Sequence, residues 1–131
     1  MVQTKGPVIW VVEDDPSVQR IVADSLKHHG FSPLIFDSAE KAYGALHFNS
    51  YPSLIILDML LPGMSGVDLI RLLKQNKDWE KIPVVVVSVL TRQEAPNAEP
   101  TEELRTAFWV NKPFEPNDLI QKIQEILTAV R

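Results

Sequence analysis

The chain has 131 residues, the size of one ordinary domain, so we expect a single domain over residues 1–131 with its core at about 8–130. It carries no cysteine, which excludes disulfides and thiolate metal sites, and no apolar run reaches the ~20 residues that a transmembrane helix needs. A formal net charge of −4 without a cluster of Lys and Arg argues against direct binding of nucleic acid. We therefore expect a cytoplasmic protein that binds neither a membrane nor nucleic acid by itself.

Short apolar runs alternate with amphipathic stretches along the chain, which predicts alternating strands and helices. The runs are continuous and rich in β-branched residues, as in strands that are covered on both faces. In chain order, we expect a strand at 8–12, a helix at about 16–29, a strand at 33–36, a helix that begins near residue 39, a strand at 54–57, a helix at about 67–73, strands at 84–87 and 108–110, and a last helix at 119–130.

Residues at the predicted helix ends support these boundaries. Asp15 is a candidate N-cap because its side chain can accept a backbone N–H, and Pro16 suits the first helical position. Gly30 favours the end of that helix. The segment Asp37-Ser38-Ala39-Glu40 resembles a capping box that opens the second helix.

Five apolar strands separated by helices predict a parallel sheet with helices on both faces. The right-handed crossover rule makes a doubly wound α/β sheet the natural topology, and in such sheets ligands bind outside the carboxyl ends of the strands. The residues directly after the strands are therefore the candidates for function: Glu13, Asp14 and Asp15 after the first, Asp58 after the third, Ser88 after the fourth, and Asn111, Lys112 and Pro113 after the fifth.

This set of polar residues at one edge of the sheet points to a metal ion. Alone, each residue has an ordinary structural explanation, such as a turn or a helix cap. Together, clustered carboxylates repel one another and raise each other's pKa unless a cation joins them. Mg²⁺ prefers a few carboxylate oxygens and several waters, which Glu13, Asp14 and Asp58 can supply, and Mn²⁺ is an alternative. With Ser88 and Lys112 nearby, the set suits transfer of a phosphoryl group to Asp58.

Three motifs, in this order, resemble those of the response-regulator receiver family of two-component signalling. They are the acidic cluster that starts at Glu13, the run Asp58-Met59-Leu60-Leu61-Pro62-Gly63-Met64-Ser65-Gly66, and Lys112-Pro113-Phe114. The resemblance covers residues 8–130. It implies a flavodoxin-like (βα)5 fold with strand order 2-1-3-4-5. It also implies a phosphorelay switch that is no enzyme beyond its own phosphorylation and autodephosphorylation.

The resemblance implies a role for each matching residue. Asp58 accepts a phosphoryl group from a phosphohistidine of a sensor histidine kinase or a histidine phosphotransfer protein. The ligands of Mg²⁺ are the side chains of Glu13, Asp14 and Asp58 and the backbone carbonyl of Leu60.

The phosphoryl group is then bound by Ser88 and Lys112, and the bond between Lys112 and Pro113 is expected to be cis. Trp109 takes the position of the family's aromatic switch, and a plain packing role for this ring is the alternative. The expected target is a downstream effector protein or a fused output domain. A homodimer through the face of the fourth helix, fifth strand and last helix is a further expectation.

Two leucines depart from the polar residues that the family often carries near the phosphorylation site. Leu60 and Leu90 stand two residues after Asp58 and Ser88, where they would flank an attacking water. Leucine offers that water no hydrogen bond, so we expect slow autodephosphorylation. The alternative is that the two leucines only pack against each other.

The segment 91–100 departs most from the family, which runs a fourth helix here. Pro96 and Pro100 would each remove a helical hydrogen bond, which costs ~3 kcal/mol in a helix interior. We expect a loop or a short, broken fourth helix, followed by a helical turn at 101–106.

Two other functions stay open on the sequence. A receiver-like module that works only through protein contacts would keep the fold without using phosphorylation. A haloacid-dehalogenase-type phosphohydrolase also uses an aspartate nucleophile, Mg²⁺ and a lysine. That class needs a second acid two residues after the nucleophile, where this chain has Leu60, so it is disfavoured.

Overall fold

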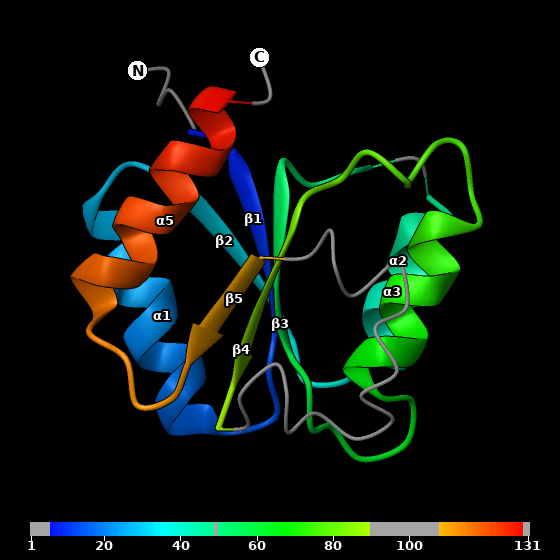
Figure 1. Ribbon diagram of the computed structural model, residues 1–131, viewed down its shortest axis with the longest axis horizontal. Coiled ribbons are helices and arrows are strands. Elements are labelled where there is room, and N and C mark those ends of the chain that lie inside the picture. Colours follow the sequence, from blue (N-terminus) through cyan, green and yellow to red (C-terminus); the bar gives the residue numbers. More distant parts are fainter. Residues whose placement is uncertain (1–5, 49, 90–107, 130–131) are drawn as a thin grey trace.

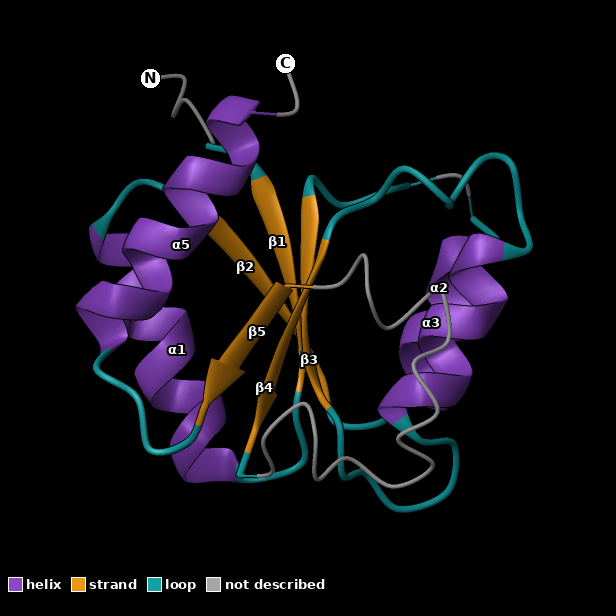
Figure 2. Cartoon of the chain, in the orientation of Figure 1, coloured by secondary structure: helices purple, strands orange, loops and turns teal. Residues whose placement is uncertain are grey.

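The computed structural model describes residues 6–48, 50–89 and 108–129, which form one parallel sheet between two layers of helices (Figures 1 and 2). The strands are β1 (Val8–Val12), β2 (Ser32–Phe36), β3 (Leu54–Asp58), β4 (Val84–Ser88) and β5 (Phe108–Asn111). They pair in parallel in the order β2-β1-β3-β4-β5. The expected doubly wound sheet and its strand order are confirmed.

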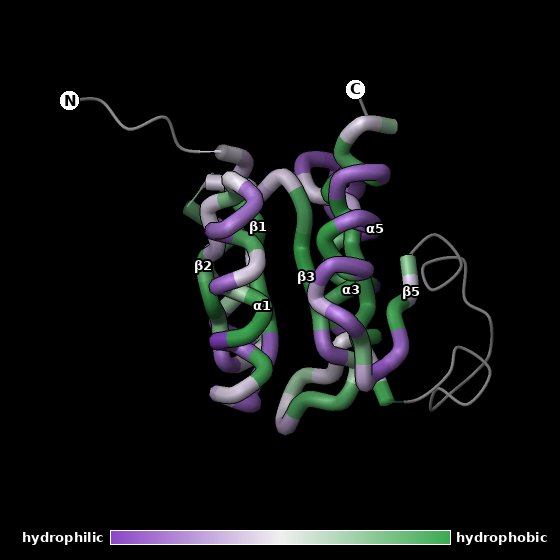
Figure 3. The backbone as a smooth tube through the Cα atoms, turned by 90° about the vertical axis from the view of Figure 1, so that its left-hand side faces the viewer, coloured by the Kyte–Doolittle hydropathy of each residue, from purple (hydrophilic) through white to green (hydrophobic). Residues whose placement is uncertain are grey.

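Helices cover both faces of this sheet. On one side lie α1 (Pro16–His28) and α5 (Pro116–Ala129), and on the other lie α2 (Ala39–Leu46) and α3 (Gly66–Lys74) (Figure 2). Figure 3 shows β3 as hydrophobic along its length, whereas α1 and α5 alternate between hydrophobic and hydrophilic turns. This contrast is expected for strands that are covered on both faces and helices that keep one face in solvent.

Alternate residues of the central strands pack into two separate cores. The core beside α1 and α5 takes from the strands the buried side chains of Ile9, Val11, Leu54, Ile56, Val85 and Val87. The core beside α2 and α3 takes those of Trp10, Val12, Ile55, Leu57, Val84 and Val86. Because successive strand residues point to opposite faces, a continuous apolar run serves both cores at once.

The first helix begins at the predicted residue and ends at His28, one residue before the predicted end. Asp15 is its N-cap and accepts a hydrogen bond from the backbone N–H of Ser17, with Pro16 in the first helical position. The chain leaves the helix through Gly30, whose φ of +87° lies in the left-handed region that favours glycine.

The predicted capping box at the start of α2 is wrong in one half. Ser38 does cap the helix, since its hydroxyl accepts the backbone N–H of Lys41, but the residue at that third position is lysine rather than an acid. Glu40 lies one position earlier and accepts the backbone N–H of Met64 instead, at 3.2 Å. A true capping box opens α3, where Ser65 and Asp68 bond each other's backbone N–H.

β2 forms one edge of the sheet and carries exposed apolar side chains. Leu34 is 48% exposed and Ile35 is 39% exposed. The N–H of Ser32 and the carbonyl of Phe36 bond toward β1, and successive residues of a strand turn their backbone polar groups to opposite sides. The backbone polar groups of Pro33 and Ile35 therefore face outward from the edge.

Some predictions fall outside the described residues. These are the broken fourth helix in 91–106, the leucine at position 90, and the last residue of the predicted final helix at position 130. Of the helices that the structure describes, none combines the length and apolarity required to cross a bilayer.

Candidate functional site

The carboxyl ends of four strands bring the predicted polar residues to one edge of the sheet. Parallel register aligns Val12 with Leu57, so Glu13 and Asp58, the next residues along, emerge side by side. Ser88 ends β4 beside the last residue of β5. The buried polar side chains within the described ranges are those of Glu13, Asp58 and Ser88, which are 3%, 8% and 0% exposed. Burial of a polar group is costly, so three such groups at one edge of the sheet mark this edge as a candidate functional site.

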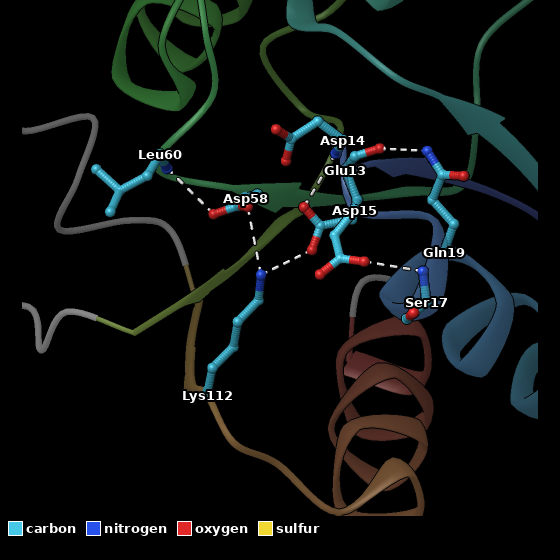
Figure 4. Close-up of polar contacts among 8 residues, drawn as sticks. All are labelled: Glu13, Asp14, Asp15, Ser17, Gln19, Asp58, Leu60 and Lys112. Carbon is cyan, nitrogen blue, oxygen red and sulfur yellow. Dashed lines mark hydrogen bonds and ion pairs between the residues drawn. The ribbon is translucent and has the colours of Figure 1, made fainter.

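Lys112 bridges the two buried carboxylates (Figure 4). Its Nζ lies 2.7 Å from Oε1 of Glu13 and 3.3 Å from Oδ2 of Asp58. The other oxygen of Asp58, Oδ1, accepts the backbone N–H of Leu60 at 3.1 Å. The backbone N–H of Lys112 donates to the carbonyl of Ser88 at 2.7 Å, which fixes the end of β5 to that of β4. The predicted cis bond between Lys112 and Pro113 is present.

The turn after β1 is held by hydrogen bonds on every side of Glu13. Its backbone N–H donates to the carbonyl of Phe36 at 3.0 Å, and its own carbonyl accepts from Nε2 of Gln19 at 2.6 Å. Its Oε2 accepts the backbone N–H of Asp14 at 3.0 Å. Gln19 was not among the predicted site residues. Its position one turn into α1 could have identified it, because a polar side chain there can reach back to the end of the strand.

Three carboxylates could hold a divalent cation. Glu13, Asp14 and Asp58 each offer an oxygen, and these ligand atoms lie within 4.8 Å of one another. Asp14 is exposed while the other two are buried, so the cluster is open on one side to water. An all-oxygen set with room for waters fits Mg²⁺ or Mn²⁺ better than zinc, which takes nitrogen and sulfur ligands.

Burial and the neighbouring charged groups shift the pKa values of Glu13 and Lys112. Burial, with added contributions from the hydrogen bond and the charge of Asp58, raises the pKa of Glu13 from 4.5 to about 7, although Lys112 opposes the shift. Burial opposes the charged form of Lys112, but the hydrogen bond to Glu13 and the two carboxylate charges outweigh it and raise the pKa of Lys112. Burial is the largest cause of the shift at Glu13, and the ammonium group of Lys112 opposes it only in part.

The remaining predicted residues lie nearby. Trp109 is half-buried on β5 and packs against the core beside α2 and α3. Leu60 is 46% exposed beside Asp58, and Asp15 serves as the helix cap. A hydrophobic groove of about 390 Å³ flanks the site, lined by Val18, Ile21, Val89, Lys112, Pro113 and Phe114.

The sequence matches a family model described as "Response regulator receiver domain" over residues 9–124. The phosphate regulon transcriptional regulatory protein PhoB of Klebsiella pneumoniae is 32% identical over 124 residues, which cover 93% of this chain and 52% of PhoB. Hybrid signal transduction histidine kinase D of Dictyostelium discoideum is 27% identical over 129 residues, 93% of this chain and 8% of that protein. The chain thus spans about half the length of the PhoB-type relatives that it matches.

Solved structures agree with the sequence comparisons. The signal receiver domain of a signal transduction histidine kinase from Syntrophus aciditrophicus superposes with a TM-score of 0.86 at 26% identity, covering 96% of this chain and 93% of that one. A CheY-like response regulator receiver domain protein from Methanospirillum hungatei gives a TM-score of 0.81 at 28% identity, with 95% and 96% covered.

Proposed function

Because the chain belongs to the response regulator receiver domain family of two-component signalling, we propose that Asp58 is its phosphoryl acceptor. The observation that carries the proposal is the surroundings of the Asp58 carboxylate. One oxygen contacts Nζ of Lys112 at 3.3 Å, and the carboxylate lies within 4.8 Å of the ligand atoms of Glu13 and Asp14. We further propose that the whole chain, with its core at about 8–130, is one receiver domain.

The family generally binds Mg²⁺ at an acidic pocket, and this chain has such a cluster. We infer that Glu13, Asp14 and Asp58 hold Mg²⁺, or Mn²⁺, together with the backbone carbonyl of Leu60. When bound, the cation neutralises charge on the phosphoryl oxygens. The acid-only donor set, whose ligand atoms lie within 4.8 Å of one another, supports this assignment.

The chain's own residues then have distinct tasks in the transfer. An oxygen of Asp58 forms a bond to phosphorus while the bond from phosphorus to the donor histidine nitrogen breaks, and the bonding electron pair stays with the imidazole. The ammonium of Lys112 moves from Asp58 to an equatorial phosphoryl oxygen. The hydroxyl of Ser88, at the end of β4, donates to another. Burial of Asp58 at 8% exposure strengthens both contacts by limiting access of water.

Receiver domains work with histidine kinases and output domains. For this chain we propose a sensor histidine kinase or a histidine phosphotransfer protein as donor, and the groove lined in part by Lys112 offers that protein an apolar contact. The phosphorylated state would act on a downstream effector or a fused output domain, with Trp109 as the switch side chain. A homodimer through β5, α5 and the segment before β5 is a further proposal.

Phosphorylation with a small phosphodonor tests the proposal directly. In Mg²⁺, intact mass should show the addition of one phosphoryl group to the wild type and none to Asp58→Asn. The control Asp24→Asn neutralises an exposed aspartate of α1 and should be phosphorylated like the wild type. Chelation of Mg²⁺ should abolish the addition. A wild type that gains no mass would favour the module that works by protein contacts alone.

A further inference from the structure

The peptide unit between Glu13 and Asp14 is hydrogen-bonded through both of its polar groups. Its carbonyl, which belongs to Glu13, accepts from Nε2 of Gln19 at 2.6 Å. Its N–H, which belongs to Asp14, donates to Oε2 of Glu13 at 3.0 Å. Figure 4 shows Gln19 reaching this carbonyl from the first turns of α1. The unit that joins two proposed metal ligands is thus held at both ends.

Holding this unit fixes the directions of both side chains. A peptide group is planar, so it turns as a whole when ψ of Glu13 or φ of Asp14 changes. A change in either angle that the other does not cancel turns the two residues, and with them their carboxylates, relative to each other. Two carboxylates that lie beside Asp58 repel one another, which favours movement apart when no cation is present.

Two other hydrogen bonds of the turn flank this peptide unit without contacting it. The N–H of Glu13 is bonded to the carbonyl of Phe36, which lies on the strand side of Glu13. The side chain of Asp15 is bonded to the N–H of Ser17, which lies on the helix side. Of the hydrogen bonds described for this turn, the one from Gln19 alone connects the Glu13–Asp14 peptide to α1.

We propose that Gln19 is a positioning residue that holds the Glu13–Asp14 peptide in the orientation that binds a divalent cation. The proposal rests on the proposed function, because it assumes that these acids hold Mg²⁺. Gln19 contacts the backbone carbonyl rather than the carboxylates, so it acts by orientation and leaves the ligand charge unchanged. Partners that orient ligands commonly affect metal affinity strongly.

The test compares Gln19→Met, which keeps the length of the side chain and removes the donor, with the same change at Gln121. Gln121 lies exposed on α5 and bonds Glu125 within its own helix. Calorimetric titration with Mg²⁺ gives the dissociation constant. The rate of phosphorylation by a small phosphodonor across Mg²⁺ concentrations then gives a half-saturation value and a saturated rate.

We expect Gln19→Met to weaken Mg²⁺ binding about three- to tenfold, the equivalent of one hydrogen bond, with the saturated rate unchanged and with Gln121→Met like the wild type. Gln19→Ala should weaken binding by a similar factor. An unchanged dissociation constant in Gln19→Met, or a lowered rate at saturating Mg²⁺, overturns the inference. A wild type that binds no Mg²⁺ would instead overturn the proposed function.

Discussion

Gly66 opens α3 where the helix runs against the segment that carries Asp58. Its N–H donates to the carbonyl of Met59 at 3.2 Å, and the residue is buried. A Cβ added here would lie 2.7 Å from the carbonyl oxygen of Asp58 and 3.0 Å from Cα of Met59. Both neighbours are backbone atoms, so Gly66→Ala forces a displacement of the chain at the proposed phosphoryl acceptor.

The expected cost follows from this geometry. Overpacking a well-packed site typically costs about 1–3 kcal/mol, whereas alanine in place of glycine in a helix gains at most about 1 kcal/mol. Gly44 supplies the matched control, because it is exposed in α2 and an added Cβ meets nothing within 4 Å. Gly44→Ala should therefore raise the free energy of unfolding by about 0.5–1 kcal/mol, and Gly66→Ala should lower it by about 1–2 kcal/mol.

Urea unfolding followed by circular dichroism measures both changes, and intact mass measures the rate of phosphorylation. We expect Gly66→Ala to unfold at lower urea and to accept phosphate more slowly, since the Asp58 backbone has moved. Gly44→Ala should unfold at higher urea with an unchanged rate. If Gly66→Ala were as stable as Gly44→Ala, the reasoning would be refuted. Close packing between α3 and the end of β3 would then not explain the glycine at position 66.

Three further predictions concern the acidic edge. Without metal, Glu13 binds a proton more tightly in the folded chain, with a pKa of about 7 against 4.5, so its contribution to stability is full below pH 4.5 and is lost as the pH rises through 7. In chelator, urea midpoints should therefore fall over this range more in the wild type than in Glu13→Gln, and parallel pH profiles would contradict the shift. Lys112→Met should slow phosphorylation by on the order of a hundredfold, because the only described cation at the Asp58 carboxylate is lost; a rate within twofold of the wild type would exclude that role. The acyl phosphate should decay slowly and Leu60→Asn should speed its decay, as measured by loss of the added mass; a wild-type half-life of seconds would refute the shielding by leucine.

The sequence was sufficient to predict the fold and which polar residues lie together at the edge of the sheet. Parallel strands meet at their carboxyl ends, so reading the residue after each strand is enough to bring Glu13, Asp58 and Ser88 together. That rule follows from topology and needs no knowledge of side-chain conformations.

Contacts that depend on the path of a turn could not be predicted in this way. The amide of Gln19 reaches Glu13 only because the turn after β1 directs the carbonyl toward α1. Glu40 was assigned to a local capping box, yet its partner Met64 lies 24 residues further along the chain. Local spacing suggested the nearest backbone N–H as the donor to Glu40, and the tertiary structure supplied a different donor.

The outward-facing Pro33 has a consequence for self-association. An edge strand with exposed Leu34 and Ile35 would otherwise be a template on which a strand of another molecule could pair and aggregate. A proline has no N–H, so the outward ladder of β2 lacks a donor at position 33 and a neighbouring strand could not pair along it without interruption. The protein thus keeps an apolar edge beside β1 while protecting itself from growth of the sheet into fibres, and Pro33→Val should form aggregates more readily than the wild type.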